Sequence, residues 1–189
     1  FGLWLGCSVP LVFLGSMMGF RRQPISDFVK TNMIARSIPS QPLYLHPIFT
    51  ALLSGGLMFG SIFVEFYFIM DALWQHDIYY MFGFLLLILT TTLLMGAELS
   101  ITLTYMQLCH EDHQWWWRSF INGGSAGAMI MIYSIYYHLT YLEFDLFVSS
   151  VVYYSYMCVI AGLYGLMTGS VGALGSMWFV RYIYGAAKL

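Results

Sequence analysis

The residues with the clearest chemical potential form one polar run in the middle of the chain. This run, CHEDH, consists of Cys109, His110, Glu111, Asp112 and His113. Thiolate and imidazole are ligands that zinc prefers, and two histidines three positions apart share a face wherever a helix continues. A structural zinc ion usually takes four ligands, and the sequence has no second cluster of cysteine and histidine to complete the set. We therefore predict no metal ion and no other cofactor, and we expect both histidines to be replaceable.

A membrane interface explains the same run better, because three tryptophans and an arginine follow it. The interfacial signature consists of Glu111, Asp112, Trp115, Trp116, Trp117 and Arg118. Amphipathic indole rings favour the headgroup region, where an arginine can also lie against an indole face. We expect the two acidic residues to cap a turn between two spans or to pair with Arg118.

Soluble-enzyme and nucleic-acid chemistry are not expected. The sequence contains no G-x-G-x-x-G, Walker A, H-E-x-x-H or nucleophile-elbow motif. Its seven lysines and arginines form no stripe of the kind that binds nucleic acid. We predict neither an enzyme with catalytic residues nor a nucleic-acid partner.

The composition predicts a membrane protein. Hydrophobic residues make up 60% of the chain and charged residues 8%, a balance that is not typical of soluble domains. A spanning helix needs about 20 mostly apolar residues, and such stretches occur at 1–20, 48–74, 80–108, 120–139 and 146–180. The expected fold is an all-α polytopic transmembrane bundle of about five spans. Its regions are a transmembrane helix over 1–20, which can be an incomplete span, a cytosolic loop over 21–47 and a four-span bundle over 48–189.

The positive charges predict the orientation of these spans. If the chain crosses the membrane at each apolar stretch, all seven cations fall on one side. They are Arg21, Arg22, Lys30, Arg36, Arg118, Arg181 and Lys188. By the positive-inside rule, the loop over 21–47, the CHEDH run and the C-terminus face the cytosol.

The residues around the CHEDH run form a motif that is rare enough to be recognised. It reads Tyr105-x-Gln107-Leu108, then Glu111-Asp112, then Trp115-Trp116-Trp117-Arg118-Ser119. Further matching positions include Thr31-Asn32, Ile38-Pro39, Ala97-Glu98, Thr168-Gly169 and Arg181-Tyr182. This pattern resembles that of the nonaspanins, the transmembrane nine superfamily. His110 and His113 stand where that family usually carries small or aromatic residues.

The resemblance implies a function as well as a fold. It implies a large lumenal domain and earlier spans that precede this chain, which would hold about the last five of nine spans. It also implies residence in Golgi and endosomal membranes and a role in the sorting or surface delivery of other membrane proteins. The partners would be membrane lipids, transmembrane cargo proteins and coat proteins at the C-terminal tail. Lys188 is the candidate for a coat-retrieval signal, although family chains tend to end in Lys-x-Asp or Lys-x-Glu and this one ends in Lys188-Leu189.

Two carboxyl groups inside spans support an alternative function, a proton- or ion-coupled transporter or channel. Intramembrane Glu65 and Glu98 are costly and therefore functional candidates. Helical spacing places Ser54 and Ser61 on the face of Glu65, and it places Thr91, Thr102 and Tyr105 on the face of Glu98. The two groups lie ~14 Å and ~27 Å from the lumenal ends of their helices, which indicates separate sites. Each carboxyl group could equally serve to fix helix contacts.

Small residues form a stripe along the last span. Ser155, Cys158, Gly162, Gly165, Gly169, Gly172 and Ser176 lie within an arc of ~100° on an ideal helix. Such faces let helices approach closely in a membrane. The stripe therefore either packs within the bundle or receives the spanning helices of cargo.

Overall fold

The computed structural model describes residues 2, 4–21, 34, 37–75, 78–142 and 147–186, and every regular element in these ranges is a helix. The all-α prediction is confirmed. The chain divides into two compact units, Phe1–Ala35 with Tyr184–Leu189 and Arg36–Ile183. In the first unit, the π-helix η1 (Trp4–Ser8) leads into α1 (Val9–Phe20), whose side chains are all exposed. The apolar helical stretch Gly6–Phe20 is shorter than a full span.

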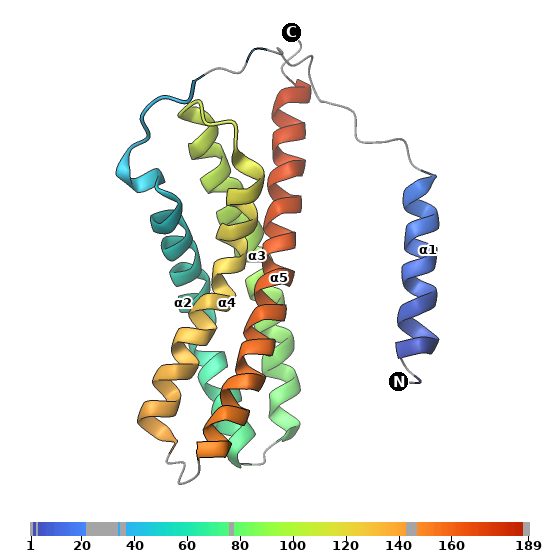
Figure 1. Cartoon of the computed structure of the whole chain (residues 1–189), viewed down its shortest axis with the longest axis vertical. Coiled ribbons are helices and arrows are strands. Elements are labelled where there is room, and N and C mark those ends of the chain that lie inside the picture. Colours follow the sequence, from blue (N-terminus) through green and yellow to red (C-terminus); the bar gives the residue numbers. More distant parts are fainter. Residues whose placement is uncertain are drawn as a thin grey trace. The chain divides into compact units, whose positions relative to one another are not determined.

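The second unit is a bundle of four long helices (Figure 1). After the 3₁₀ turn η2 (Leu43–Leu45), the helices are α2 (Pro47–Gln75), α3 (Ile78–Cys109), α4 (Trp115–Tyr141) and α5 (Phe147–Ala186). Most of their ends lie within a few residues of the predicted apolar stretches. The exceptions are α4, which begins at Trp115 rather than near Phe120, and α5, which extends to Ala186. The tryptophans therefore form the first turn of α4 instead of part of a loop.

Three of these helices are long and apolar enough to cross a membrane. The stretches are Pro47–Ala72, Met81–Cys109 and Phe147–Ala186. The fourth helix, α4, has 27 residues, which is long enough to span, but it is less apolar because it carries residues such as Asn122 and Ser134. Both of these side chains are buried against neighbouring helices. A helix that hides its polar face inside a bundle does not need to be apolar all round.

The core of the bundle changes character along its length. At the end near the α2–α3 and α4–α5 connections it is apolar and aromatic, and Phe66 and Tyr133 meet edge to face with ring centroids 5.6 Å apart. Toward the α3–α4 turn, small and polar side chains such as Ser100, Thr104 and Ser176 are buried beside apolar ones such as Leu103 and Val180. This second half holds the candidate functional site.

Candidate functional site

A buried polar stripe on α3 connects three helices. Thr92, Ser100, Thr104 and Gln107 follow one another mainly at intervals of four or eight residues, so they share a face of α3, and all four are buried. In a membrane, such side chains require partners inside the protein. Thr92 and Thr104 find such partners on α4 and α5, and Gln107 finds one in Asp112 of the α3–α4 turn.

The stripe meets hydroxyl groups of both neighbouring helices. The Thr104 hydroxyl donates a hydrogen bond to Ser176 Oγ of α5 at 3.0 Å and lies 2.7 Å from Ser119 Oγ of α4. One end of the stripe is tied to α5, where the Tyr164 hydroxyl donates to Thr92 Oγ1. These contacts hold α3, α4 and α5 in one register.

The two polar faces that the sequence predicts, around Glu98 on α3 and around Glu65 on α2, do not coincide with this buried stripe. On α3, Glu98, Thr102 and Tyr105 are exposed and Thr91 is half-buried, so the predicted face points away from the buried stripe. A repeat of small and hydroxyl residues at Thr92, Gly96, Ser100 and Thr104 was the sequence signal for the buried face. The sequence analysis did not predict this buried face, because it assigned the polar face of the helix to the side that carries the charged residue Glu98.

On α2, the predicted face is divided. Ser54 is fully buried, Glu65 is half-buried and Ser61 is exposed, with its hydroxyl bonded to Leu57 O of its own helix. The helix crosses its neighbours at an angle, so its buried stripe drifts from Ser54 to Met58 and Ile62 along the helix.

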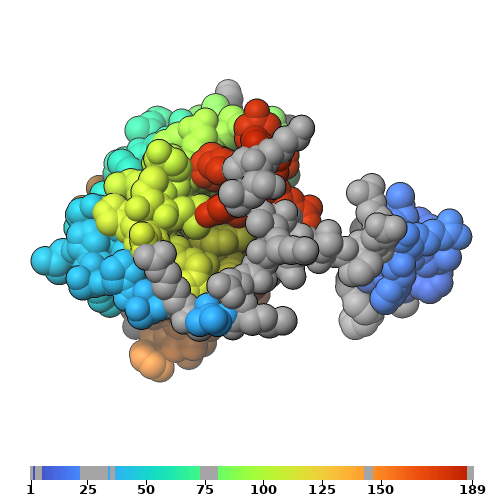
Figure 2. Space-filling view, turned by 90° about the horizontal axis from the view of Figure 1, so that it is seen from above, coloured from blue at the N-terminus to red at the C-terminus, as the bar shows by residue number. Residues whose placement is uncertain are grey.

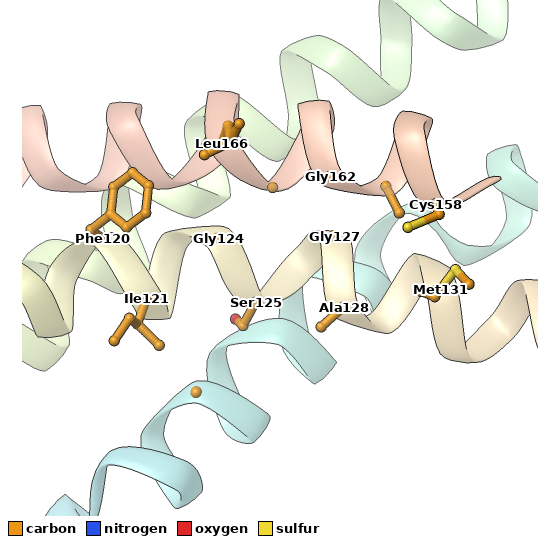
Figure 3. A pocket seen from close by; sticks show the side chains of 13 residues that line it. Phe120, Ile121, Gly124, Ser125, Gly127, Ala128, Met131, Cys158, Gly162 and Leu166 are labelled. Carbon is orange, nitrogen blue, oxygen red and sulfur yellow. The ribbon is translucent and has the colours of Figure 1, made fainter. Parts of the chain in front are cut away.

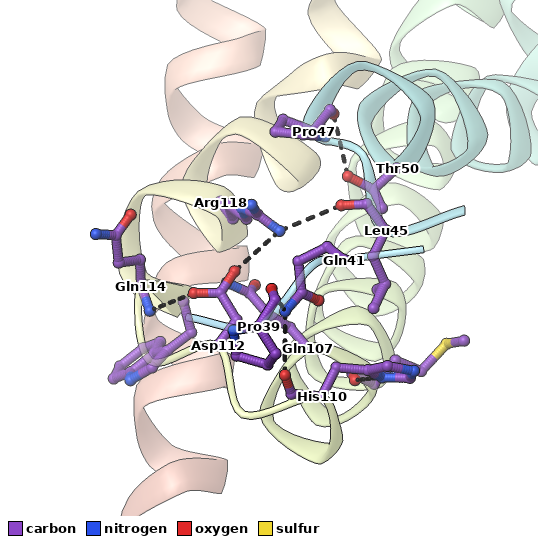
Figure 4. A network of polar contacts seen from close by, with 12 residues as sticks. Pro39, Gln41, Leu45, Pro47, Thr50, Gln107, His110, Asp112, Gln114 and Arg118 are labelled. Atoms are coloured by element: carbon purple, nitrogen blue, oxygen red, sulfur yellow. Dashed lines mark hydrogen bonds and ion pairs between the residues drawn. The ribbon is translucent and has the colours of Figure 1, made fainter. Parts of the chain in front are cut away.

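Asp112, in the turn between α3 and α4, lies at the centre of a polar network (Figure 4). Gln107 Nε2 donates to Asp112 Oδ2 at 3.0 Å, and the backbone N–H of Gln114 donates to Asp112 Oδ1 at 3.0 Å. Arg118 Nη1 lies 3.2 Å from Asp112 Oδ2 and also donates to Leu45 O at 3.2 Å. The neighbouring Glu111 has a φ of 60°, which reverses the chain direction. A buried carboxylate thus receives three donors, as such a group requires.

The segment that precedes α2 is fastened to the same turn. We call residues 37–46 the strap, and Figure 2 shows it beside the turn at one end of the bundle. Gln41 Nε2 donates to His110 O at 3.1 Å, and the Tyr44 hydroxyl lies 2.8 Å from His110 Nε2. His110 Nδ1 lies 2.8 Å from Met106 O. Because a carbonyl oxygen only accepts, Nδ1 carries the proton in a neutral ring and Nε2 accepts from Tyr44.

Both nitrogens of His110 are therefore engaged in hydrogen bonds and are not available to a metal ion. The part of the chain that the structure describes contains no group of three histidine, cysteine or carboxylate side chains suited to hold one. Cys109 and His113 are exposed. His110 thus serves as an attachment point for the strap, a role that the sequence did not indicate.

The tryptophans face out of the bundle. Trp116 and Trp117 are exposed and Trp115 is half-buried. Trp115 packs edge to face on Trp116, and Trp117 packs in the same way on Phe120. Their outward position at one end of the bundle suits indole rings at a headgroup interface.

Glycines bring α4 and α5 into backbone contact. A Cβ atom added to Gly123 would lie 2.8 Å from Thr168 O, and one added to Gly169 would lie 2.9 Å from Phe120 O. A Cβ atom on Gly165 would lie 3.0 Å from Gly124 O. Side chains at these positions would force the two helices apart. We call this contact the glycine seam.

The small-residue stripe of α5 has two environments. Gly165, Gly169, Gly172 and Ser176 face α4 or α3 inside the bundle. No heavy atom of a described neighbour lies within 4 Å of the position that a Cβ atom on Gly162 would take, and Ser155 and Cys158 are exposed. The stripe is therefore packed over most of its length and open at the end nearer the start of α5.

An open apolar groove lies at this free end (Figure 3). It has a volume of about 640 Å³ and lies between α4 and α5, with Ala51 of α2 at one side. We call it the glycine groove. Its lining consists of Ala51, Phe120, Ile121, Gly124, Ser125, Gly127, Ala128, Met131, Cys158, Ala161, Gly162, Gly165 and Leu166. Four of its lining residues are glycines, and among these four Gly162 alone has open space at its Cβ position.

Among the described residues, the other predicted site residues lie outside this groove. Neither Glu65 nor Glu98 belongs to its lining. Lys188, the candidate retrieval signal, lies outside the described residues.

Comparison with known proteins adds a family assignment. Residues 1–147 match the family described as Endomembrane protein 70. The chain is 43% identical over 187 residues to Transmembrane 9 superfamily member 10 of Arabidopsis thaliana and 39% identical over 187 residues to member 4 of Homo sapiens. Both alignments cover 99% of this chain, which spans 29% of the length of these relatives. No solved structure matches the chain.

Proposed function

The chain belongs to the endomembrane protein 70 family, the transmembrane 9 superfamily, and on this premise we propose that it sorts other membrane proteins by binding their spanning helices. The family assignment supports a multi-spanning endomembrane protein. The glycine groove is the observation that carries the more specific role.

The surface of the groove suits a helix better than a polar solute. Its lining is almost entirely apolar, and it is open to the outside of the bundle. Helices in lipid gain little from hydrophobic burial, because lipid tails are also apolar, so close packing and backbone contacts decide their association. Gly162, whose Cβ position has open space around it, offers such contacts to an incoming helix, including Cα–H to carbonyl contacts, whereas Gly124 and Gly127 already pack against α5.

The exposed carboxyl group of α3 gives little support to the alternative of transport. Glu98 lies on the outward face of α3, and its neighbour Thr102 bonds to the backbone of that helix. Glu65 is half-buried on α2. A transport pathway would need an aqueous cavity at Glu65 or at Glu98, whereas the glycine groove is apolar and is lined by neither residue.

The proposed site of action rests on the family assignment. We propose residence in Golgi and endosomal membranes, with coat proteins as partners of the C-terminal tail around Lys188. The family description as endomembrane proteins supports the first part. The resemblance of the chain to the nonaspanins supports the second.

A side chain placed in the groove tests the sorting role. Gly162→Leu adds bulk where the protein has open space, so the variant should fold and reach its normal location. Spanning cargo should then be mislocalised, and its crosslinking to a photoreactive residue at position 158 should be lost. Gly60→Leu is the matched control, because Gly60 also has open space around its Cβ position but does not line the groove. Normal cargo delivery by full-length Gly162→Leu would refute the proposed role of the groove.

A further inference from the structure

A second cavity lies inside the bundle, where all four long helices meet. We call it the inner cavity; it has a volume of about 260 Å³. Met70 of α2, Met81 and Ile88 of α3, Ile130 of α4, and Met157 and Tyr164 of α5 contribute to its wall. It is separate from the glycine groove, which shares none of these residues.

The described wall of the inner cavity offers no free hydrogen-bond donor. Tyr164 is the one residue of that described wall with a polar side-chain group, and its hydroxyl donates to Thr92 Oγ1. Thr92 in turn donates to Ile88 O at 2.7 Å. An apolar cavity of this kind stays free of water and accepts apolar molecules. An occupant of this cavity would therefore need to be apolar.

The inner cavity lies at the depth of lipid chains. Ile88 is ten residues from the start of α3 at Ile78, which corresponds to ~15 Å along the helix. Met70 is five residues from the end of α2 at Gln75, or ~8 Å. The hydrocarbon core of a bilayer is ~30 Å thick, so these residues lie within the leaflet next to the α2–α3 connection.

The inner cavity opens sideways toward the bilayer. Leu85 of α3 and Ile160 of α5 line it and are also 43% and 52% exposed on the outer surface of the bundle. Both belong to helices that are apolar enough to span a membrane. The opening therefore lies on the apolar outer surface of this four-helix bundle. Methionine side chains in the wall adapt their shape to a flexible guest.

We propose that the inner cavity binds an acyl chain of a membrane lipid, inserted between α3 and α5 from the leaflet next to the α2–α3 connection. The volume is slightly below the ~300–1,000 Å³ of sites for drug-sized molecules, which suits part of one chain rather than a whole lipid. The headgroup stays outside, at the level of the helix ends. This binding is distinct from the proposed sorting role, which uses the glycine groove.

Photolabelling of the full-length protein tests this binding. The protein is reconstituted in nanodiscs that contain a phosphatidylcholine with a diazirine in its acyl chain, and labelled residues are located by mass spectrometry. Lipid around the bundle reaches Leu86, which is 68% exposed, but it does not reach Ile130, which is 3% exposed. Acyl-chain binding predicts labelling of both residues.

Two variants decide whether label at Ile130 comes through the inner cavity. Ile88→Phe fills the cavity, and Leu85→Phe narrows its mouth on an exposed surface where folding should be unaffected. Each should lower labelling of Ile130 at least fivefold and leave labelling of Leu86 unchanged. Leu86→Phe is the matched control and should leave labelling of Ile130 intact. Labelling confined to exposed residues, or labelling of Ile130 that persists in Leu85→Phe, would overturn the proposal.

Discussion

Arg118 and Asp112 lie 3.2 Å apart at the turn between α3 and α4, and the Asp112 side chain is only 2% exposed. The same guanidinium group bonds to the backbone of Leu45, so one ion pair joins the turn to the segment before α2. The acidic pair of the family motif thus has two roles. Asp112 is a buried anchor, whereas Glu111 supplies the reversal of the chain.

Asp112→Asn should destabilise the protein, because it removes the charge that Arg118 faces in a buried position. Loss of one partner of a buried pair costs roughly 3–5 kcal/mol, and we expect about half of that here because Arg118 is partly exposed. Thermal unfolding in detergent should show a lower midpoint. The matched control Glu111→Gln should stay within about 0.5 kcal/mol of the wild type, because that side chain is exposed. Equal midpoints for Asp112→Asn and the wild type would contradict this role of the pair.

Tyr44→Phe should loosen the strap, because it removes the hydroxyl that lies against His110. Hydrogen exchange of residues 37–46 should become faster while exchange in the middle of α3 stays unchanged. His110→Asn should have the same effect. His113→Tyr is the control, since His113 is exposed. Unchanged hydrogen exchange of residues 37–46 in Tyr44→Phe would contradict this prediction and show that the other contacts hold the strap in place.

Gly169→Leu should strongly reduce the amount of folded protein. Its Cβ atom would lie 2.9 Å from Phe120 O, and no backbone atom can yield without separation of α4 and α5. Overpacking of this kind costs roughly 1–3 kcal/mol or more. Gly162→Leu, in the open part of the same helix, should be expressed normally. The comparison is made by size-exclusion chromatography in detergent, and equal recovery of the two variants would argue against a tight glycine seam.

Cys109 should react with a membrane-impermeant thiol reagent only from the cytosolic side, because the positive-inside rule places the CHEDH run there. Cys7→Ala and Cys158→Ala remove the other two cysteines, which are also exposed. A glycosylation acceptor inserted between residues 143 and 146 should be used in the lumen. Labelling of Cys109 from the lumenal side would reverse the predicted orientation.

The sequence by itself determined the helices and the membrane environment. A chain in lipid must satisfy its backbone hydrogen bonds locally, so apolar stretches of about 20 residues predict helices almost directly. The residues around Asp112 and Trp115–Arg118 were also recognisable from the sequence as a family motif. A rare motif can be identified without knowing which contacts its residues make. The pairing of Asp112 with Arg118 was one of two expected roles, and the structure shows it beside a bond to the Gln114 backbone.

Only the tertiary structure decided which face of each helix is buried. In a soluble protein, the pattern of apolar residues identifies that face, but in a membrane both lipid and core are apolar and the pattern carries little information. The buried face of α3 holds Thr104 because Ser176, 72 residues away, supplies its hydrogen-bond partner. For the same reason one stripe of α5 contains both Gly169, packed against α4, and Gly162, which is open. The positions of neighbouring helices, set by contacts distant in sequence, separate these two glycines into a seam and a groove.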